Sequence, residues 1–553
     1  MAEIVKNDTH INSMDTIGRL LRRRAQQNPD HIFCRWKNAQ ISYRQLDQSA
    51  DRVAHELHAL GVRQQDRIAV MLPHHPDHIV TLLALFRMGA IVVPVNTHLR
   101  GDSLRYILEH SVPAAIIADN AYAEQLCSEL PASAHPIWRA TIPEDAPTGS
   151  SVLAYPDLQA LIAGRPWEDK ALPDDTVAIC YTSGTTGPPK GVLITDKMCR
   201  CAARSSELLS GIQEGDTPLF WDPLYHLFGI EVVILALTRP ITLAMVERFS
   251  ASRFWRWAAE MGATHMHYVG GVIQLLLKQP PSAGDKKHNI RIAWGGGCPA
   301  ELWTEFEERF GLKVHDSFGM TETSALNIIN TEGVPGSVGR TLPYFEAKLV
   351  KASGDAASAG ELGELLIRAA EPGLITPGYF RNPEATSDLL RDGWLHTGDL
   401  LSQDEQGRFY FYSRKKDCVR RRGENISAWE VESVINKHPQ VVESALVPVR
   451  NEFGDEDLKI FVRLKPDGDL SAEELVAWCA GRMPRFQVPR FVAFIEDFPK
   501  TSTQRIQKFA LSRATDDCWD ADRQPDAAAG FHATSPRRGG GAPLLKESCN
   551  AVR

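Results

Sequence analysis

Short apolar segments alternate with helical patterns through the first 120 residues, and this alternation constrains the fold more than any other feature. Residues 68–72, 91–95 and 114–118 are predicted to be strands, and residues 42–60, 77–88 and 102–110 carry apolar side chains at helical spacing. Ser42 and Gln45 are spaced as in a capping box at the start of the first of these helices. Strands and helices that alternate in this way build βαβ units on a largely parallel sheet. The sequence therefore predicts an α/β fold.

The order of predicted strands and helices changes near residue 400. A strand at 409–412 is followed by helices at 428–437 and 472–479 and by extended segments at 441–449, 460–464 and 491–495. We predict a large N-terminal α/β body of several subdomains over residues 1–412 and a small α+β domain over residues 413–513. Residues 514–553 contain only four of Leu, Ile, Val and Phe, too few to offset the entropy of ordering, so a disordered tail is expected.

The charge and the cysteine pattern exclude several classes of protein. Lys and Arg number 61 against 69 for Asp and Glu, and the net charge of −8 has the wrong sign for a chain that mainly binds nucleic acid or an anionic membrane. The N-terminus lacks an apolar signal segment, and the ten cysteines lack metal or disulfide spacing. We expect a cytoplasmic protein with no nucleic-acid partner and no stable membrane insertion. The basic run is expected to be one solvated helix face: Arg19, Arg22, Arg23 and Arg24.

Residues Tyr181–Gly191 form the strongest local motif. Three glycines, four hydroxyl side chains and Lys190 lie between two apolar segments that are predicted to be strands. Glycines let backbone N–H groups approach an oxyanion, hydroxyls donate hydrogen bonds, and the lysine adds a positive charge. This composition suits a phosphate group, although the spacing differs from that of the Walker loop. The alternative is a glycine-rich surface turn without a ligand.

The loop resembles the phosphate-binding motif of the adenylate-forming superfamily, which includes acyl-CoA synthetases, luciferases and the adenylation domains of peptide synthetases. Members of this superfamily join a carboxylate to the α-phosphate of ATP, release pyrophosphate and pass the acyl group to a thiol. The resemblance implies that the loop binds ATP through the following residues: Thr182, Ser183, Gly184, Thr185, Thr186, Gly187 and Lys190.

Two further motifs resemble segments that border the acid and the adenine in this superfamily. Pro223–Gly229 is similar to an aromatic-His segment, which implies that His226 lies beside the substrate carboxylate. The alternative is that His226 has only a structural role, because a lone histidine is more often structural than functional. Gly295–Pro299 is similar to a turn whose bare backbone, at Gly296 and Gly297, lets the adenine and the acyl group pass.

Ser317–Glu322 resembles the Tyr-Gly-x-Thr-Glu motif of the superfamily. The resemblance implies that Phe318 stacks on adenine, Thr321 bonds the α-phosphate and Glu322 binds Mg²⁺. Ser317 and Gly319 belong to the same nucleotide-binding segment. An oxygen ligand such as Glu322 suits a hard cation. The usual tyrosine is Phe318 here, which keeps the face for stacking on adenine.

The motifs nearer the C-terminus imply a ribose site, a hinge and a CoA-binding face. Trp394–Asp399 resembles the segment whose aspartate, Asp399, accepts hydrogen bonds from the ribose hydroxyls, and Arg414 resembles an arginine that also reaches the ribose. Lys416 stands where the superfamily has its hinge residue, so the small C-terminal domain is expected to be mobile. Gly423 and Glu424 are expected on the face presented to CoA.

One catalytic position departs from the superfamily pattern. The late motif usually ends in a lysine that bridges the carboxylate and the α-phosphate, and this chain has Arg505 at that position. Arginine keeps the charge but is longer and planar. Three interpretations stay open: Arg505 takes the role, Lys508 takes it, or adenylation is impaired.

The predicted function is that of an ATP-dependent, AMP-forming acyl-CoA ligase. Its substrates would be ATP, coenzyme A and a small carboxylic acid, with Mg²⁺. Amino-acid-activating relatives have an aspartate where this chain has His226, which disfavours a free amino acid as the substrate.

The segments 281–285 and 308–323 resemble the crotonobetaine/carnitine-CoA ligase branch. Aromatic residues that could face a quaternary ammonium, or belong only to the core, are Trp221, Tyr225, Tyr268 and Trp294. Two alternative functions stay open: the protein is an adenylation enzyme that loads a carrier protein, or it is a non-catalytic relative that binds a nucleotide.

Overall fold

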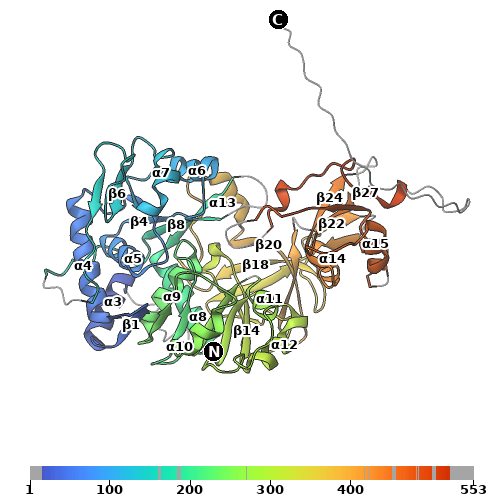
Figure 1. Cartoon of the computed structure of the whole chain (residues 1–553), viewed down its shortest axis with the longest axis horizontal. Coiled ribbons are helices and arrows are strands. Elements are labelled where there is room, and N and C mark those ends of the chain that lie inside the picture. The colour runs from blue at the N-terminus through green and yellow to red at the C-terminus, as the bar shows by residue number, and fades with distance from the viewer. Residues whose placement is uncertain are drawn as a thin grey trace, which may run out of the picture.

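The structure is a computed structural model of the whole chain. It describes residues 15–159, 164–182, 188–269, 271–415, 418–421, 424–450, 456–480, 482–483, 485–500 and 506–523. Figure 1 shows a large body that contains the N-terminal three quarters of the chain and a smaller domain, coloured orange to red, at one side of it. The α/β body and the separate C-terminal domain agree with the predicted fold class.

A seven-stranded sheet forms from the alternating segments near the N-terminus. In sheet order its strands are β7 (Ser151–Leu153), β6 (His135–Arg139), β5 (Ala115–Asp119), β3 (Arg67–Met71), β4 (Ile91–Pro94), β8 (Thr176–Thr182) and β9 (Lys190–Thr195). Every neighbouring pair is parallel except β8 and β9, which form an antiparallel hairpin. The predicted parallel βαβ arrangement is therefore confirmed, because apolar strands with helices on their faces can bury both sides.

A nine-stranded sheet forms the centre of the body. In sheet order its strands are β16 (Arg340–Thr341), β15 (Ile328–Asn330), β14 (Lys313–Phe318), β13 (Ile292–Gly296), β12 (His265–Val269), β10 (Pro218–Phe220), β11 (Leu243–Met245), β1 (Ile32–Trp36) and β2 (Ala39–Ser42). The strands from β14 to β1 are parallel, and antiparallel strands close both edges. The carboxyl ends of β10, β12, β13 and β14 consequently meet at one edge.

A five-stranded antiparallel sheet completes the body. It contains β17 (Phe345–Val350), β18 (Gly363–Ala369), β20 (Trp394–Gln403) and β19 (Leu390–Arg391), and β21 (Phe409–Arg414) pairs with β20. The helices of the body in the described residues are α3 (Ile17–Gln27), α4 (Tyr43–Ala59), α5 (Pro76–Met88), α6 (Gly101–Ser111), α7 (Ala123–Cys127), α8 (Asp196–Ser210), α9 (Leu227–Thr238), α10 (Phe254–Glu260), α11 (Val272–Leu277), α12 (Ala300–Phe310) and α13 (Pro383–Leu389). Ser42 caps α4 in the predicted capping box with Gln45.

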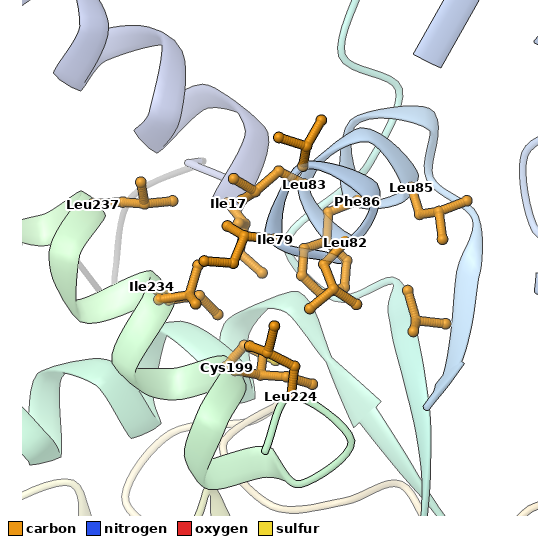
Figure 2. Close-up of a cluster of buried hydrophobic side chains, with 14 of the residues drawn as sticks. Ile17, Ile79, Leu82, Leu83, Leu85, Phe86, Cys199, Leu224, Ile234 and Leu237 are labelled. Atoms are coloured by element: carbon orange, nitrogen blue, oxygen red, sulfur yellow. The ribbon is translucent and has the colours of Figure 1, made fainter. Parts of the chain in front are cut away.

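The main hydrophobic core joins the two large sheets through their shared helices. Figure 2 shows Ile79, Leu82 and Phe86 of α5 above Cys199 of α8 and Ile234 of α9. These side chains are almost fully buried. Apart from Glu231 and Thr238, helix α9 consists of apolar residues, and almost all of it is buried, because it lies in this layer between elements, where a helix has no solvent face. None of the helices in the described residues is long and apolar enough to cross a membrane.

The C-terminal domain has the predicted mixture of strands and helices. Its elements are the hairpin β22 (Cys418–Arg421) and β23 (Glu424–Ser427), helices α14 (Ala428–Ile435) and α15 (Ala472–Ala480), and a sheet of β24 (Val441–Arg450), β25 (Glu456–Leu464), β26 (Phe491–Phe494) and β27 (Trp519–Asp520).

Two expectations from the sequence are wrong. Residues 514–523 were expected to be disordered, but Trp519 and Asp520 form β27 on the edge of β26, where Arg490 holds Asp520. Residues 524–553 lie outside the described residues. The basic run in α3 is also not one solvated face, because Arg22 forms an ion pair with Asp51 and Arg24 donates to the carbonyl of Thr238.

Candidate active site

Most of the candidate residues of the body lie at the carboxyl edge of the parallel strands. Gly296 and Phe318 end β13 and β14, and His226, in the turn after β10, is the N-cap residue of α9. Ligands of open α/β sheets bind at this edge, since the loops that follow the strands diverge there. The topology therefore brings together motifs that are up to a hundred residues apart.

Asp316 shapes the glycine turn after β13. Its Oδ1 accepts the N–H groups of Gly297 (2.9 Å) and Ser317 (2.8 Å), and its Oδ2 accepts that of Cys298 (3.1 Å). Burial raises the pKa of Asp316 to about 7, against the effect of these donors. Gly297 has φ of 91°, a conformation that favours glycine. Sequence reasoning missed Asp316, because β14 also contains Lys313, His315 and Ser317 and one more polar residue gives no signal there.

Glu322 is buried at the centre of a small ionic group. The hydroxyl of Tyr379 donates to Glu322 Oε1 at 2.8 Å, and the Nζ of Lys190 lies 4.9 Å from the centroid of the same tyrosine ring. Burial raises the pKa of Glu322, whereas the Tyr379 hydroxyl and the charges of Arg414 and Lys190 act to lower it. Tyr379, which lies in none of the predicted motifs, thus joins the carboxylate to the lysine of the loop.

The ribose candidates lie opposite each other in the third sheet. Asp399 in β20 pairs with Arg414 in β21, and Arg414 Nε lies 3.6 Å from Asp399 Oδ1. On the same strand as Arg414, the ring of Phe411 stacks at 6.2 Å on that of Phe318. Phe411 is partly exposed and was not singled out in the sequence.

The His226 turn and Thr321 are both partly exposed. The ring of His226 meets that of Tyr225 edge-on at 4.7 Å. Gly319 is tightly enclosed, because a Cβ atom there would lie 1.5 Å from the carbonyl oxygen of Ala325. Among the other candidate aromatic residues, Trp221 and Trp294 are buried, and Tyr268 is buried with its hydroxyl bonded to the carbonyl of His315.

The remaining candidates stand apart from this group or outside the described residues. Thr182 and Lys190 form the last pair of the β8–β9 hairpin, at the base of the loop. Ser183, Gly184, Thr185, Thr186 and Gly187 lie outside the described residues, as do Lys416, Gly423 and Arg505. Glu424 begins β23, and nothing is described of its side chain. Lys508 forms an ion pair with Glu432 of its own domain at 2.7 Å.

Comparisons with known proteins agree with this arrangement. The chain matches the family models "AMP-binding enzyme" over residues 21–380 and "AMP-binding enzyme C-terminal domain" over residues 430–505. It is 32% identical over 480 residues to crotonobetaine/carnitine-CoA ligase of Salmonella paratyphi A, covering 85% of this chain and 92% of the relative. The ligase of the same name from Escherichia coli O1:K1 is 32% identical over 491 residues, covering 84% and 92%.

Solved structures resemble most of the chain, including both of its parts. The o-succinylbenzoate CoA synthetase of Bacillus subtilis, in complex with its acyl-adenylate intermediate, has a TM-score of 0.78 at 26% identity and covers 90% of this chain and 98% of its own. The Mycobacterium tuberculosis fatty acyl CoA synthetase has a TM-score of 0.66 at 26% identity, covering 89% and 97%.

The fold and the gathered motifs define an adenylate-forming ligase. The chain belongs to the AMP-binding enzyme family, and it is an AMP-forming acyl-CoA synthetase. The predicted superfamily, fold class and reaction class are confirmed. The roles of individual residues and the domain boundaries stay predictions.

Proposed function

We propose that the protein forms the CoA thioester of a small carboxylic acid, of carnitine or crotonobetaine type, through an acyl-adenylate. The observation that carries the proposal is the group of Lys190, Tyr379 and Arg414 around Glu322, with Asp399 beside Arg414. Cations suit the phosphates of a nucleotide, and a carboxylate suits two ribose hydroxyls. The names of the relatives, CoA ligases for crotonobetaine and carnitine, support the acid and the acceptor.

In the first step a carboxylate oxygen of the acid attacks the α-phosphorus of ATP, and pyrophosphate leaves. The protein mainly positions the reactants and stabilises charge. Lys190 and the loop from Thr182 hold the departing phosphates, and Thr321 donates to the α-phosphate. His226 borders the acid, and Phe318 and Phe411 provide faces for adenine.

Glu322 fits a magnesium ion that is carried mainly by the nucleotide. It is a buried carboxylate, a hard oxygen ligand, and no cluster of three or more His, Cys, Asp or Glu side chains forms among the described residues. Mg²⁺ keeps several ligands from water and phosphates and needs few from the protein. Bound there, the ion would neutralise phosphate charge. The Bacillus subtilis synthetase has also been solved with ATP and a magnesium ion.

In the second step the C-terminal domain turns about Lys416, and the face that contains Gly423 and Glu424 meets CoA. The thiol attacks the acyl carbonyl and AMP leaves. Arg505 takes the role of the catalytic lysine in the first step, since Lys508 is engaged with Glu432. A cytoplasmic location, where ATP and CoA are available, also remains part of the proposal.

The test is ATP–pyrophosphate exchange over a panel of carboxylic acids that includes carnitine and crotonobetaine, with and without CoA. We expect acid-dependent exchange, and thioester and AMP when CoA is added. Glu322→Gln and Arg505→Ala should lower exchange by about 100-fold or more, as when a group that stabilises the transition state is removed. Glu332→Gln is the matched control, because Glu332 forms its ion pairs with Arg340 and Arg408 at the surface, away from the candidate site.

Each rival function gives a different result. Exchange without thioester formation, followed by acylation of a carrier protein, would support the carrier-loading enzyme. ATP binding without exchange for any acid would support a non-catalytic relative. Full pyrophosphate release in Arg505→Ala would remove Arg505 from the adenylation step.

A further inference from the structure

The strand that carries Asp399, the candidate ribose ligand, contains a bulge. Strand β20 has residues 397–399 between two of its pairs with β18, whereas β18 has only Leu365 there. Gly398, in the middle of the bulge, has φ of 70°, a conformation that favours glycine. Bulges are common beside active sites, because the extra residues bend the strand and change the direction of a side chain. The direction of Asp399 therefore depends on the groups that hold this bulge.

Two polar side chains hold the bulge. The hydroxyl of Thr397 donates to the carbonyl of Leu365 at 2.8 Å and accepts the N–H of Asp399 at 3.0 Å. From β18, Glu364 Oε1 accepts the N–H of Gly398 at 3.3 Å. The side chain of Glu364 is 14% exposed, so water competes little for its carboxylate. Thr397 belongs to a motif found in the sequence, but Glu364 lies in none of them.

The second oxygen of Glu364 contacts the neighbour of the other ribose candidate. Lys415 Nζ lies 3.2 Å from Glu364 Oε2, and Lys415 directly follows Arg414, which pairs with Asp399 across β20 and β21. The side chain of Lys415 is 59% exposed, and an ion pair with so exposed a partner contributes little to stability. The bond to the Gly398 N–H is therefore the stronger of the two contacts.

His396 completes the surroundings of this carboxylate. Its Nδ1 lies 3.6 Å from Glu364 Oε1. Burial lowers the pKa of His396, and the charges of Arg391 and Lys415 act in the same direction, against the effect of the carboxylate. The ring is therefore neutral at neutral pH, and the ion pair of Glu364 is the one with Lys415.

A carboxylate that bonds two ribose hydroxyls must point at both of them. An O–H···O hydrogen bond needs a separation of about 2.5–3.0 Å, and a displacement of about 1 Å loses it. If Glu364 is removed, the Gly398 N–H loses its acceptor and the bulge is held from one side only. Asp399 would then face the hydroxyls less closely.

We propose that Glu364 is a positioning residue for the nucleotide, which holds the bulge 397–399 so that Asp399 bonds the ribose hydroxyls. Its ion pair with Lys415 adds a lesser contact beside Arg414. Glu364 acts through Asp399 and is not a catalytic residue. The inference rests on the proposed function, in which Asp399 and Arg414 bind the ribose.

The test is calorimetric titration of the full chain, with Mg²⁺ present, by ATP and by 2′,3′-dideoxy-ATP, which lacks both ribose hydroxyls. The unchanged protein should bind ATP about tenfold or more tightly than the dideoxy nucleotide, because hydrogen bonds to a charged group are lost. Glu364→Ala should lower this preference about threefold or more, since it weakens the binding of ATP alone. Glu364→Gln keeps an acceptor for the Gly398 N–H and should lose less, and Lys415→Met should stay within about twofold of the unchanged protein. The dissociation constants do not depend on how much of a variant is folded.

Glu361→Ala is the matched control. Glu361 Oε2 also accepts a backbone N–H, that of Ser358 at 2.8 Å, and also forms an ion pair with a lysine, Lys351 at 3.3 Å, but it lies in the turn between β17 and β18. Its variant should keep the preference of the unchanged protein.

Three results would overturn the proposal. The preference for ATP could be unchanged in Glu364→Ala, or fall equally in Glu361→Ala, and Glu364 would then serve only the stability of the sheet. The unchanged protein could also bind both nucleotides equally, and Asp399 would then not bond the ribose. The titrations need neither an acid nor turnover. The expected preferences without acid-dependent exchange would therefore contradict the proposed function and support the role of Glu364.

Discussion

Tyr379 links two motifs that are more than a hundred residues apart in the chain. Its hydroxyl bonds Glu322, its ring faces Lys190, and its backbone pairs with Val192 of β9. A phenol hydroxyl that donates to a carboxylate stabilises the charged form, which burial of Glu322 opposes. At the residue scale, Tyr379 therefore favours the ionised form of the candidate magnesium ligand.

Tyr379→Phe removes this hydroxyl and keeps the ring. The pKa of Glu322 should rise further, so the acid limb of the pH–rate profile should move to higher pH. A hydrogen bond to a charged group is worth about 1.5–3 kcal/mol, which predicts a loss of roughly tenfold or more in the rate of exchange at neutral pH. The measurement is the pH dependence of ATP–pyrophosphate exchange. Tyr410→Phe, which loses a bond to the surface residue Asp404, should leave the acid limb in place. An unmoved acid limb in Tyr379→Phe would contradict the assignment.

Helix α6 holds the two strands that carry the candidate phosphate loop. The hydroxyl of Tyr106 donates to the carbonyl of Pro189 at 3.1 Å, and His110 Nδ1 lies 2.7 Å from the hydroxyl of Tyr181. The rings of Tyr106 and His110 stack at 5.4 Å. One helix face thus contacts β8 and the residue that directly precedes β9, at the base of the loop. At the element scale, we expect α6 to support nucleotide binding as well as to cover the sheet.

Tyr106→Phe should therefore weaken ATP binding. Loss of one hydrogen bond of about 0.5–1.5 kcal/mol predicts a rise of roughly two- to tenfold in the KM for ATP, with the KM for the acid unchanged. Exchange kinetics at varied ATP measure it. Tyr155→Phe is the control, because Tyr155 bonds Thr81 at 2.6 Å away from the hairpin. Equal changes in the two variants would show that only general stability is affected.

At the scale of the whole molecule, the parts predicted from the sequence are those set by near neighbours in the chain. The capping box of Ser42 and Gln45 depends on four residues, and the strands and helices of the C-terminal domain depend on local periodicity. The parts that were missed depend on distant pairing. Nothing local places Asp51 beside Arg22, Tyr379 beside Glu322 or Asp520 beside Arg490. The candidate motifs were found because each is a short continuous segment. Asp316 and Phe411 were missed because their partners, Gly297 and Phe318, come close to them only in the folded chain.

The ordered segment after residue 513 gives the last prediction. The side chain of Lys459 is fully buried, and its Nζ bonds the carbonyl of Ala514 at 2.7 Å and Asp517 Oδ1 at 2.5 Å. Truncation after Arg513 would remove both partners and β27, and leave a buried charge unpaired. Such a loss costs about 3–5 kcal/mol. We expect calorimetry to show a lower unfolding temperature for the C-terminal domain in this variant.

Truncation after Arg523 is the matched control, since it keeps β27 and both partners of Lys459. Its unfolding temperature should equal that of the full chain. Asp517→Asn should reproduce part of the loss, and Asp516→Asn, on an exposed neighbour, should not. Lys459 lowers the pKa of Asp517, so the stability that this pair contributes is present at neutral pH and disappears as the pH falls through the lowered pKa. If the two truncated chains unfold at the same temperature, the segment 514–523 covers the domain without stabilising it.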